Sequence, residues 1–266
     1  KKNILINDLK TSSKYIVKKG DSLKILNFHK DKFKNKIIYN RAVNISVDVL
    51  KKFKDSIIYQ NNDFIILNKW SSIATQSGTN ITVSIDDIIK KISVEYKLVH
   101  RLDKDTSGLL VISKNKKFAK IFGNLFKSKL ISKTYLSICE GKPKLKHSTV
   151  DLNIKNKSDK IENTKTFYKT LNSNRGLSLI LFKPITGKMH QLRIVSKNLS
   201  CPIVGDSKYN NQSKFKKEIL KLNAHVLNFS ISNTDYEFIS ELPNDFISFL
   251  KKNNLKYSKK NLKIRN

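Results

Sequence analysis

The chain alternates short apolar runs with turn-forming residues over most of its length, and this pattern constrains the fold more than any other feature. Runs of strand length that are bounded by glycine, asparagine, aspartate or serine are typical of β-strands joined by hairpins. Hairpins connect antiparallel neighbours, so a mainly antiparallel sheet is predicted. The predicted strands span 56–60 and 64–70 about an Asn-Asn-Asp turn, then 108–115, 132–141, 148–155, 163–171, 177–183, 224–231 and 235–240.

Four other segments carry apolar residues at helical spacing. The first begins with Ser84 and has Asp87 three residues later, which is the pattern of a capping box. Many strands with a few interspersed helices predict the α+β class, a mixed and mainly antiparallel sheet with flanking helices. The predicted helices lie within 84–96, 116–126, 186–199 and 245–253.

Composition divides the chain into four parts. The first consists of strand-like runs around a predicted Gly20-Asp21 hairpin turn, and the second is rich in lysine. The third holds the elements described above, and the last is a lysine- and asparagine-rich tail that is expected to fray. These parts are a small basic β-rich module at 1–28, a basic connector at 29–55, a large domain at 56–253 and a basic tail at 254–266.

Positive charge dominates the composition. The 53 lysine and arginine residues outnumber the 21 aspartate and glutamate residues, which gives a formal net charge of +32 over 266 residues. An excess of this size favours a polyanionic partner, because cations that neutralise phosphates release bound counterions. Nucleic acid is therefore the predicted partner. The alternatives are a compositional bias toward lysine and an anionic membrane surface, although the sequence has no apolar run long enough to cross a membrane.

The two cysteines, Cys139 and Cys201, lack the spacing of a zinc site and are too few for a disulfide framework. We therefore expect no metal site and a reducing, cytoplasmic location. The chain starts at Lys1 and its one methionine is Met189, so further residues upstream are also expected.

The segment HRLDKDTSGLL, residues 100–110, places an arginine and two aspartates between apolar runs. On its own it fits a solvated turn in which Asp105 or Thr106 caps the backbone. Three further segments favour a functional interpretation, and they follow in the order KTYL at 133–136, TGKMHQLR at 186–193 and CPIVGDSKY at 201–209. Together the four segments resemble the RluA/RluC/RluD branch of the pseudouridine synthases, and the RluC type most.

This resemblance covers about residues 57–250 and implies the pseudouridine synthase fold. The segment NILINDLKTSSKYIVKKGDSLKI, near the N-terminus, is similar to the second half of an αL-type RNA-binding module. The chain departs from the family pattern at Trp70, where proline is usual, and at Val195 and Asn223, where histidine often stands. These departures bear on substrate choice and leave the catalytic residues in place.

The resemblance implies that uridine is isomerised to pseudouridine without a cofactor, because the reaction involves no net redox change. It assigns the nucleophile to Asp103, since a carboxylate can trap either the sugar or the base. Arg193 is implied as the guanidinium that keeps this carboxylate ionised. Tyr135 is implied as the ring that stacks on the base near its C5 proton, and Arg101 as the side chain that fills the space left by the flipped uridine.

Arginine usage gives independent support for two of these assignments. Five of the 53 basic residues are arginines, and both Arg101 and Arg193 lie within the motifs. In a chain that otherwise uses lysine, arginine at these two positions indicates a need for a planar, permanently charged fork.

Further residues are predicted to contact the substrate or the RNA backbone. The alternative role of His190 and Gln191, in the TGKMHQLR segment, is to brace their helix. The alternative for Tyr135 is that it is a half-buried strand residue without a catalytic role. Asp105 is expected to serve as a turn residue only. The predicted contact residues are His100, Thr106, Lys133, His190, Gln191 and Lys69.

The leading hypothesis is an isomerase that acts as a monomer on large-subunit ribosomal RNA or its assembly intermediates. A catalytically inactive ribosomal-RNA-binding protein of the same fold would explain the charge equally well, but not the intact set of Asp103, Tyr135 and Arg193. A glycosidase or nuclease would release free uracil or cut strands. A paired-carboxylate mechanism would need both Asp103 and Asp105, which are poorly placed for it two residues apart in a turn.

Overall fold

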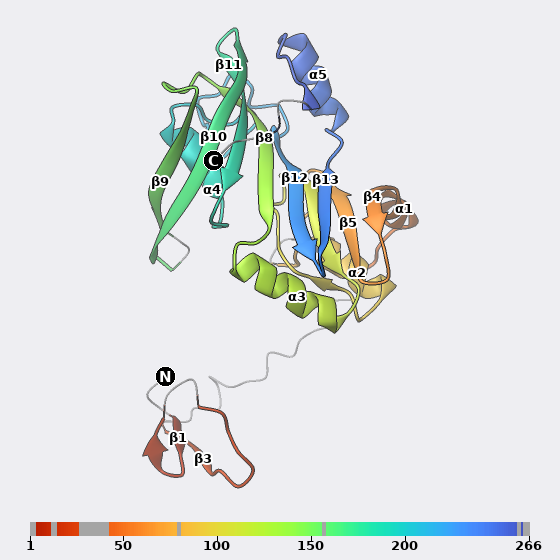
Figure 1. Ribbon diagram of the computed structural model, residues 1–266, viewed down its shortest axis with the longest axis vertical. Coiled ribbons are helices and arrows are strands. Elements are labelled where there is room, and N and C mark those ends of the chain that lie inside the picture. The colour runs from red at the N-terminus through yellow and green to blue at the C-terminus, as the bar shows by residue number, and fades with distance from the viewer. Residues whose placement is uncertain are drawn as a thin grey trace. The chain divides into compact units, whose positions relative to one another are not determined.

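The computed structural model of the chain describes residues 4–11, 15–26, 43–78, 81–155, 158–259 and 262. It divides into two compact units, residues 1–42 and 43–266, and each is described by itself. The smaller unit is a three-stranded antiparallel sheet of order β2-β1-β3, with β1 at Ile4–Ile6, β2 at Leu9–Lys10 and β3 at Leu23–Ile25 (Figure 1).

The tight hairpin of the smaller unit differs from the one predicted. Asn7 and Asp8 have positive φ angles of 51° and 62° and join β1 to β2. Asparagine and aspartate tolerate this left-handed region because their short side chains bond locally. The Gly20-Asp21 turn lies before β3, where the Asp21 carboxylate accepts a hydrogen bond from the Lys18 amide at 2.8 Å.

The larger unit is built on one mixed sheet of ten described strands, which confirms the predicted α+β class. The main path has the order β4-β5-β7-β12-β8-β11-β10-β9, while β13 pairs with β12 and β6 with β7. Among the described strands, β7 and β12 form the one parallel pair. The strands are Ile57–Gln60 (β4), Phe64–Lys69 (β5), Lys97–Leu98 (β6), Ser107–Ser113 (β7), Ser132–Glu140 (β8), His147–Lys155 (β9), Ile161–Asn174 (β10), Leu177–Pro184 (β11), Leu222–Ile231 (β12) and Thr234–Ile239 (β13).

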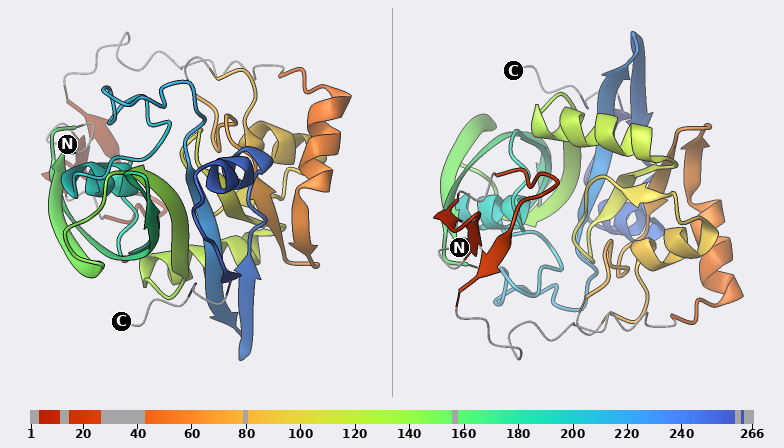
Figure 2. Two further views of the ribbon diagram at one scale, coloured as in Figure 1. Left: turned by 90° about the horizontal axis from the view of Figure 1, so that it is seen from above. Right: turned by 90° about the horizontal axis from the view of Figure 1, so that it is seen from below.

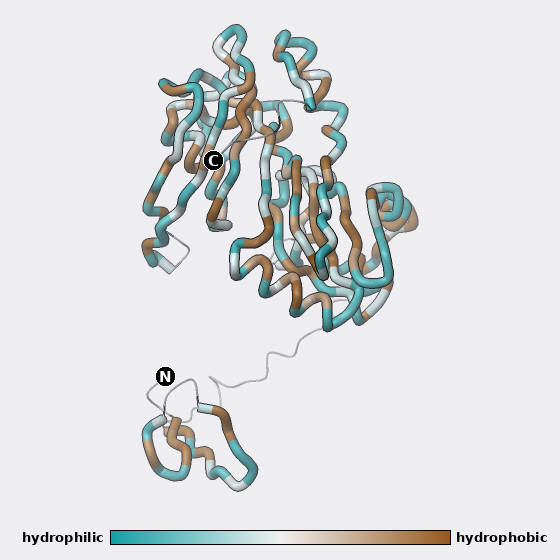
Figure 3. Tube along the Cα trace, in the orientation of Figure 1, coloured by the Kyte–Doolittle hydropathy of each residue, from teal (hydrophilic) through white to brown (hydrophobic). Residues whose placement is uncertain are grey.

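Helices pack on both faces of this sheet. The predicted capping box forms at the start of α2, where the Ser84 hydroxyl accepts the Asp87 amide and the Asp87 carboxylate accepts the Ser84 amide. Apolar residues concentrate along the central strands (Figure 3). The helices are α1 (Val47–Asp55), α2 (Ile85–Ile92), α3 (Lys116–Lys127), α4 (Gln191–Asn198) and α5 (Asn244–Lys252).

Strand β7 shows how the sheet is buried on both sides. Its side chains alternate in direction, so Leu110 and Ile112 pack with α1 and α2 while Leu109 and Val111 pack with Phe122 of α3. A strand covered on both faces needs a continuous apolar run, and GLLVI supplies it.

Strand β11 repeats this arrangement in the other half of the sheet. Leu179 packs in the cluster that contains α5, and Ile180 packs in the cluster that contains α4. Strands β8 to β11 curve around α4 (Figure 2). The loop before β7 and the start of α4 belong to different halves of the sheet, and the site described below lies between them.

Two expectations about the ends of the large domain need correction. The segment 29–55, expected as a connector, contains α1, whose Phe53 is buried in the core; the part of this segment before residue 43 lies outside the described residues. In the tail, expected to fray, the described residues 254–259 and 262 instead include Leu255 and Leu262, which are buried against α5; the rest of the tail lies outside the described residues. Both segments look polar because lysines surround a few apolar anchors, and those anchors determine the packing.

None of the described helices combines the length and the apolar character that crossing a membrane would require.

Candidate active site

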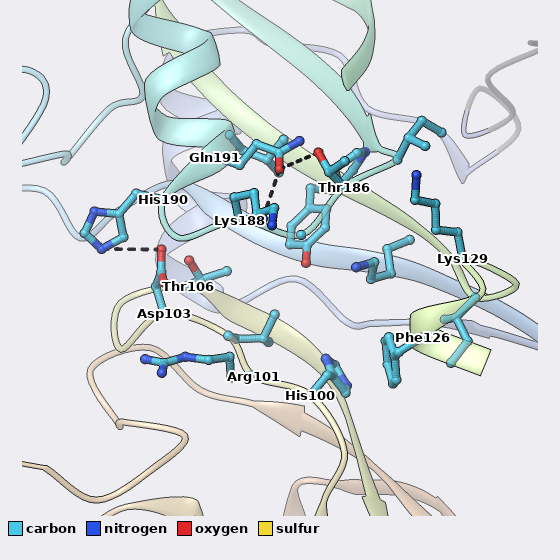
Figure 4. Close-up of a pocket in the computed structure, with 18 of the residues that line it drawn as sticks. His100, Arg101, Asp103, Thr106, Phe126, Lys129, Thr186, Lys188, His190 and Gln191 are labelled. Carbon is cyan, nitrogen blue, oxygen red and sulfur yellow. Dashed lines mark hydrogen bonds and ion pairs between the residues drawn. The ribbon is translucent and has the colours of Figure 1, made fainter. Parts of the chain in front are cut away.

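A pocket of about 650 Å³ opens where the loop before β7 faces β8 and the segment that leads from β11 into α4 (Figure 4). Among the described residues that line it, Asp103 is the one carboxylate. The other charged side chains of the wall are all cationic. The cationic side chains of the wall are Arg101, Lys127, Lys129, Lys133, Lys188 and Arg193.

The backbone holds Asp103 at the pocket wall. Its side chain is 24% exposed, and its carbonyl accepts the Thr106 amide at 3.1 Å, which closes a tight turn. The preceding residue, Leu102, is bound on both sides by the buried Thr75 hydroxyl, which donates to its carbonyl at 2.7 Å and accepts from its amide at 3.1 Å. Two loops that are distant in sequence therefore fix the direction of the carboxylate.

Arg193 lies in the first turn of α4, but its fork does not grip Asp103 as expected. Nε and Nη2 donate to the two carboxylate oxygens of the buried Asp206 at 2.8 and 2.7 Å, and Nη1 lies 4.0 Å from Asp103 Oδ2. Burial would raise the pKa of Asp206, but the Arg193 hydrogen bonds and the Tyr209 amide outweigh it and hold this pKa below its usual value. Arg193 is thus anchored by one acid and extended toward another.

His190, the residue that precedes α4, approaches the same oxygen of Asp103. Its Nε2 lies 3.9 Å from Asp103 Oδ2, and its Nδ1 shares a hydrogen bond with the Tyr209 hydroxyl at 3.0 Å. Figure 4 shows His190 and Asp103 facing each other at the pocket. Burial lowers the pKa of His190 despite the nearby Asp103 charge, so the ring is predominantly neutral at neutral pH.

Tyr135 and Lys133 lie on one face of β8 and line the pocket together with Asp103. Burial, and secondly the Asp103 charge, raise the pKa of Tyr135, so its hydroxyl keeps its proton at neutral pH. Lys133 Nζ lies 5.6 Å from the centre of the Phe126 ring, and burial lowers the pKa of this lysine. The pocket therefore offers a neutral phenol and a partly desolvated cation.

The three predicted contact or catalytic residues of the HRLDKDTSGLL segment on either side of Asp103 have different environments. Arg101 is exposed and Nη1 donates to Gln76 Oε1 at 3.3 Å, which leaves the rest of its fork available. His100 Nε2 accepts the Val111 amide at 2.8 Å, and burial lowers its pKa to about 3, so it is a neutral brace on β7. Thr106 is buried beside Asp103 and lines the pocket.

Two predicted contact residues make all their side-chain hydrogen bonds inside the protein. Lys69 has no exposed surface, and its ammonium donates to the carbonyls of Trp70, Ile73 and Lys104 at 3.0 to 3.1 Å. All three of its protons are used, so it cannot bind RNA. It is a brace of the loop that carries Asp103.

Gln191 is the second of these residues. It has the alternative role given in the sequence analysis, which is to brace its helix. Its Oε1 accepts from Thr186 Oγ1 and the Lys188 amide, and its Nε2 donates to Thr166 Oγ1 and the Lys165 carbonyl. Each polar atom of the amide has two partners inside the protein, so none is left for the substrate.

Asp206 and Tyr209 are the site residues that sequence reasoning did not assign. Both belong to the CPIVGDSKY segment, which was recognised without a role for its polar residues. An acidic residue after a buried apolar run in a chain of net charge +32 was the available signal. In the described part of the chain, no group of three or more His, Cys, Asp or Glu side chains is arranged to hold a metal ion.

Comparison with known proteins identifies the class to which this fold and site belong. The family model for RNA pseudouridylate synthase matches residues 63–198. A solved structure, human RNA pseudouridylate synthase domain containing 4, superposes with a TM-score of 0.70 at 24% identity over 79% of this chain and 97% of that chain, which shows the shared fold.

Curated relatives cover more of the sequence. Ribosomal large subunit pseudouridine synthase C of Rickettsia conorii is 41% identical over 79% of this chain and 75% of that protein. The protein of the same description from Buchnera aphidicola is 30% identical over 92% of this chain and 82% of that protein. The chain therefore belongs to the RNA pseudouridine synthase family, of the RluA type, and is an isomerase.

Proposed function

We propose that this enzyme isomerises specific uridines of large-subunit ribosomal RNA to pseudouridine, with Asp103 as the nucleophile acting on a flipped-out nucleotide. Two of the relatives described above are named as pseudouridine synthases of the ribosomal large subunit, and the resemblance to the RluC type supports the same substrate. The observation that carries the proposal is the single pocket carboxylate, Asp103, set among cationic side chains. A paired-carboxylate glycosidase would need a second acid in this wall.

The proposed reaction is balanced without a cofactor. The N1–C1′ bond of uridine breaks, a C5–C1′ bond forms, the C5 proton is lost and N1 gains a proton. Asp103 supplies an electron pair to the sugar or the base in the first half and is regenerated in the second. Tyr135, which keeps its proton, is placed to stack on the base while it turns, since it lines the same pocket.

Access to the pocket requires the target uridine to leave its stack. Arg101 is exposed next to Asp103 and is the residue proposed to fill the space that the base vacates. Lys127, Lys129 and Lys133 line the pocket and are proposed to hold the phosphates on either side of the flipped nucleotide. The three-stranded N-terminal unit is proposed to add a second RNA contact, on the basis of its resemblance to an αL-type module.

We further propose that the enzyme works as a monomer in the cytoplasm on ribosomal RNA or its assembly intermediates, with no metal or cofactor. The redox-neutral reaction described above needs no external electron carrier. The salt dependence of RNA binding should be steep, because lysines supply most of the charge.

Asp103→Asn tests the proposal. The amide keeps the shape of the carboxylate but is a poor nucleophile, so tritium release from RNA labelled at uridine C5 should cease while RNA binding in a filter assay stays nearly unchanged. Asp105→Asn is the matched control, because Asp105 lies two residues away and does not line the pocket. It should retain most of the activity.

Three outcomes would contradict the proposal. A wild-type protein that binds ribosomal RNA and never releases tritium would be an inactive binding protein. Free uracil or shortened strands in the RNA products, detected by mass spectrometry, would indicate a glycosidase or nuclease. Equal activity in Asp103→Asn and the wild type would remove Asp103 from the chemistry.

A further inference from the structure

The two oxygens of Asp103 have different surroundings. Two side chains approach Oδ2, His190 Nε2 at 3.9 Å and Arg193 Nη1 at 4.0 Å. Among the described residues, Oδ1 has no hydrogen-bond or ion-pair partner. One oxygen therefore faces protein donors, and the other is left for a substrate.

Arg193 alone cannot set this orientation. Two of its three nitrogens bind Asp206, so one nitrogen, Nη1, extends toward Asp103. One long contact leaves the carboxylate free to rotate about its last torsion, which is broad for aspartate. A second donor close to Oδ2 would restrict this rotation, and His190 Nε2 lies 3.9 Å from the same oxygen.

The Asp103 charge and the Tyr209 hydroxyl together favour one tautomer of His190. A neutral imidazole has one N–H group, and the Asp103 charge favours the tautomer in which this group is on Nε2. Nδ1 then accepts, so the Tyr209 hydroxyl donates to it across the 3.0 Å contact. Burial, Arg193 and Lys208 all lower the pKa of His190, while Asp103 and Asp206 raise it, and the balance keeps the ring neutral.

The backbone conformation at His190 and around Tyr209 explains why these two side chains meet. His190 precedes α4 in a left-handed conformation with φ of 55° and makes no side-chain hydrogen bond to the helix, so its ring is directed elsewhere. Asp206 Oδ1 accepts the amides of Lys208 and Tyr209 at 3.0 Å each. The Tyr209 ring then lies edge-on to His190, with centroids 5.6 Å apart, and 5.2 Å from the Arg193 guanidinium carbon.

We propose that His190 is a positioning residue whose Nε2–H tautomer is stabilised by the Tyr209 hydroxyl, and that it holds Asp103 Oδ2 so that Oδ1 is the oxygen that attacks the uridine. This inference rests on the proposed function of Asp103 and adds to it the residues that orient the nucleophile. His190 acts through Asp103 and does not touch the base.

Two substitutions of His190 distinguish this role from simple bracing of α4. His190→Gln keeps an N–H group near the position of Nε2, whereas His190→Asn keeps one only near Nδ1. Asparagine is the better residue for the left-handed conformation that precedes the helix. Bracing therefore predicts that Asn is the milder change, and the proposed role predicts that Gln is.

The assay is single-turnover tritium release from a transcript of large-subunit ribosomal RNA labelled at uridine C5, with enzyme in excess. We expect His190→Asn to lose about tenfold in rate and His190→Gln about threefold, with RNA affinity unchanged in both. Asn equal to or faster than Gln would overturn the proposal, and so would a loss confined to affinity.

Tyr209→Phe tests the second half of the proposal. It removes the hydroxyl and keeps the ring against Arg193, so the rate should fall about threefold in the wild-type background. In the His190→Asn background it should have no further effect, because the group it acts through is gone. Tyr168→Phe is the matched control, since this buried tyrosine donates to the Leu145 carbonyl and does not line the pocket, and it should leave the rate unchanged.

Additive losses in the Tyr209→Phe, His190→Asn double variant would overturn the coupling of these two residues. Asp103→Asn in the same assay keeps the two proposals apart. If Asp103→Asn is inactive while all His190 and Tyr209 variants match the wild type, the proposed function stands and this inference fails. If Asp103→Asn is as active as the wild type, both fail.

Discussion

Arg193 shows how a single side chain depends on a partner that carries out no chemistry. Asp206 uses both oxygens to hold the fork, and this leaves Nη1 as the Arg193 nitrogen that extends toward Asp103, the proposed nucleophile. Because the Arg193–Asp206 pair is buried and bidentate, loss of either partner leaves an unmatched charge inside the protein. The direction of Nη1 is therefore a property of the pair.

Arg193→Lys and Asp206→Asn should both slow the reaction. Lysine keeps the charge and loses the planar fork, and asparagine keeps the shape and loses the charge that anchors it. We expect each to reduce the single-turnover rate of tritium release at least about tenfold, roughly 1.4 kcal/mol of barrier, with little change in RNA affinity.

Arg175→Lys is the control for these two variants, since Arg175 is exposed in a turn outside the motifs. It should be neutral. Small and equal effects at Arg193 and Arg175 would remove the guanidinium from the mechanism. A loss of RNA binding in place of rate would make Arg193 a phosphate contact.

At the scale of elements, the loop that carries Asp103 is held by the end of β5 and the segment that follows it. The Lys69 ammonium joins the Trp70 and Ile73 carbonyls to the Lys104 carbonyl, next to the nucleophile, and the Thr75 hydroxyl bridges to Leu102. Burial lowers the pKa of Lys69 to about 7, although the nearby Asp105 and Asp103 raise it. The loop is thus tied to β5 by one internal cation.

Lys69→Met should lower stability without weakening RNA binding. Methionine fills the volume and removes the cost of a buried charge, but it leaves three carbonyls unpaired. An unpaired buried polar group costs about 1–3 kcal/mol, so we expect a net loss of roughly 2 kcal/mol in the free energy of unfolding, measured by urea denaturation.

Lys104→Met is the matched change at an exposed lysine of the same loop and should be neutral for stability. An unchanged urea midpoint for Lys69→Met, together with weaker RNA binding, would return Lys69 to the predicted role of an RNA contact.

For the whole molecule, a buried polar network connects the C-terminal segment to the strand that follows the nucleophile. His225 has no exposed surface; its Nε2 bonds the Tyr257 hydroxyl at 2.6 Å and its Nδ1 lies 3.2 Å from Asn223 Oδ1. Asn223 Nδ2 then donates to Ser107 Oγ at 2.9 Å, at the start of β7. Burial, and secondly Lys259, lower the pKa of His225 to about 4.

The depressed pKa of His225 makes stability depend on pH. Its ordinary pKa is 6.5, so between pH 6.5 and about 4 the unfolded chain binds more protons than the folded one. Stability therefore falls as pH drops through this window and is independent of His225 above it. We expect His225 to account for about 3 kcal/mol of this fall.

His225→Gln removes the titration, so urea denaturation from pH 7 to pH 4 should show a shallower fall in the variant than in the wild type. The variant is expected to be less stable than the wild type at pH 7, and the slope is the diagnostic quantity. Identical slopes would show that His225 does not carry this pH dependence.

The sequence by itself determined most of the elements and the identity of the motif residues. Alternation of apolar residues and helical spacing are local patterns, so most strands of the large domain, the α2 capping box and four of the five described helices could be located within a few residues, whereas α1 and β6 were not predicted. The four motif segments indicated the family, and they named Asp103, Tyr135 and Arg193, which the structure brings to one pocket.

Only the tertiary structure decided which partner each charged group meets. Arg193 and Asp206 are 13 residues apart, Lys69 and Lys104 are 35 apart, and Asn223 and Ser107 are 116 apart. No local pattern encodes such pairs, because they form when β7 lies beside β12 and α4 enters the curve of β8 to β11. The polar segments around α1 and Leu255 are buried for the same reason: a few apolar anchors find a sheet face that exists only after the strands have paired.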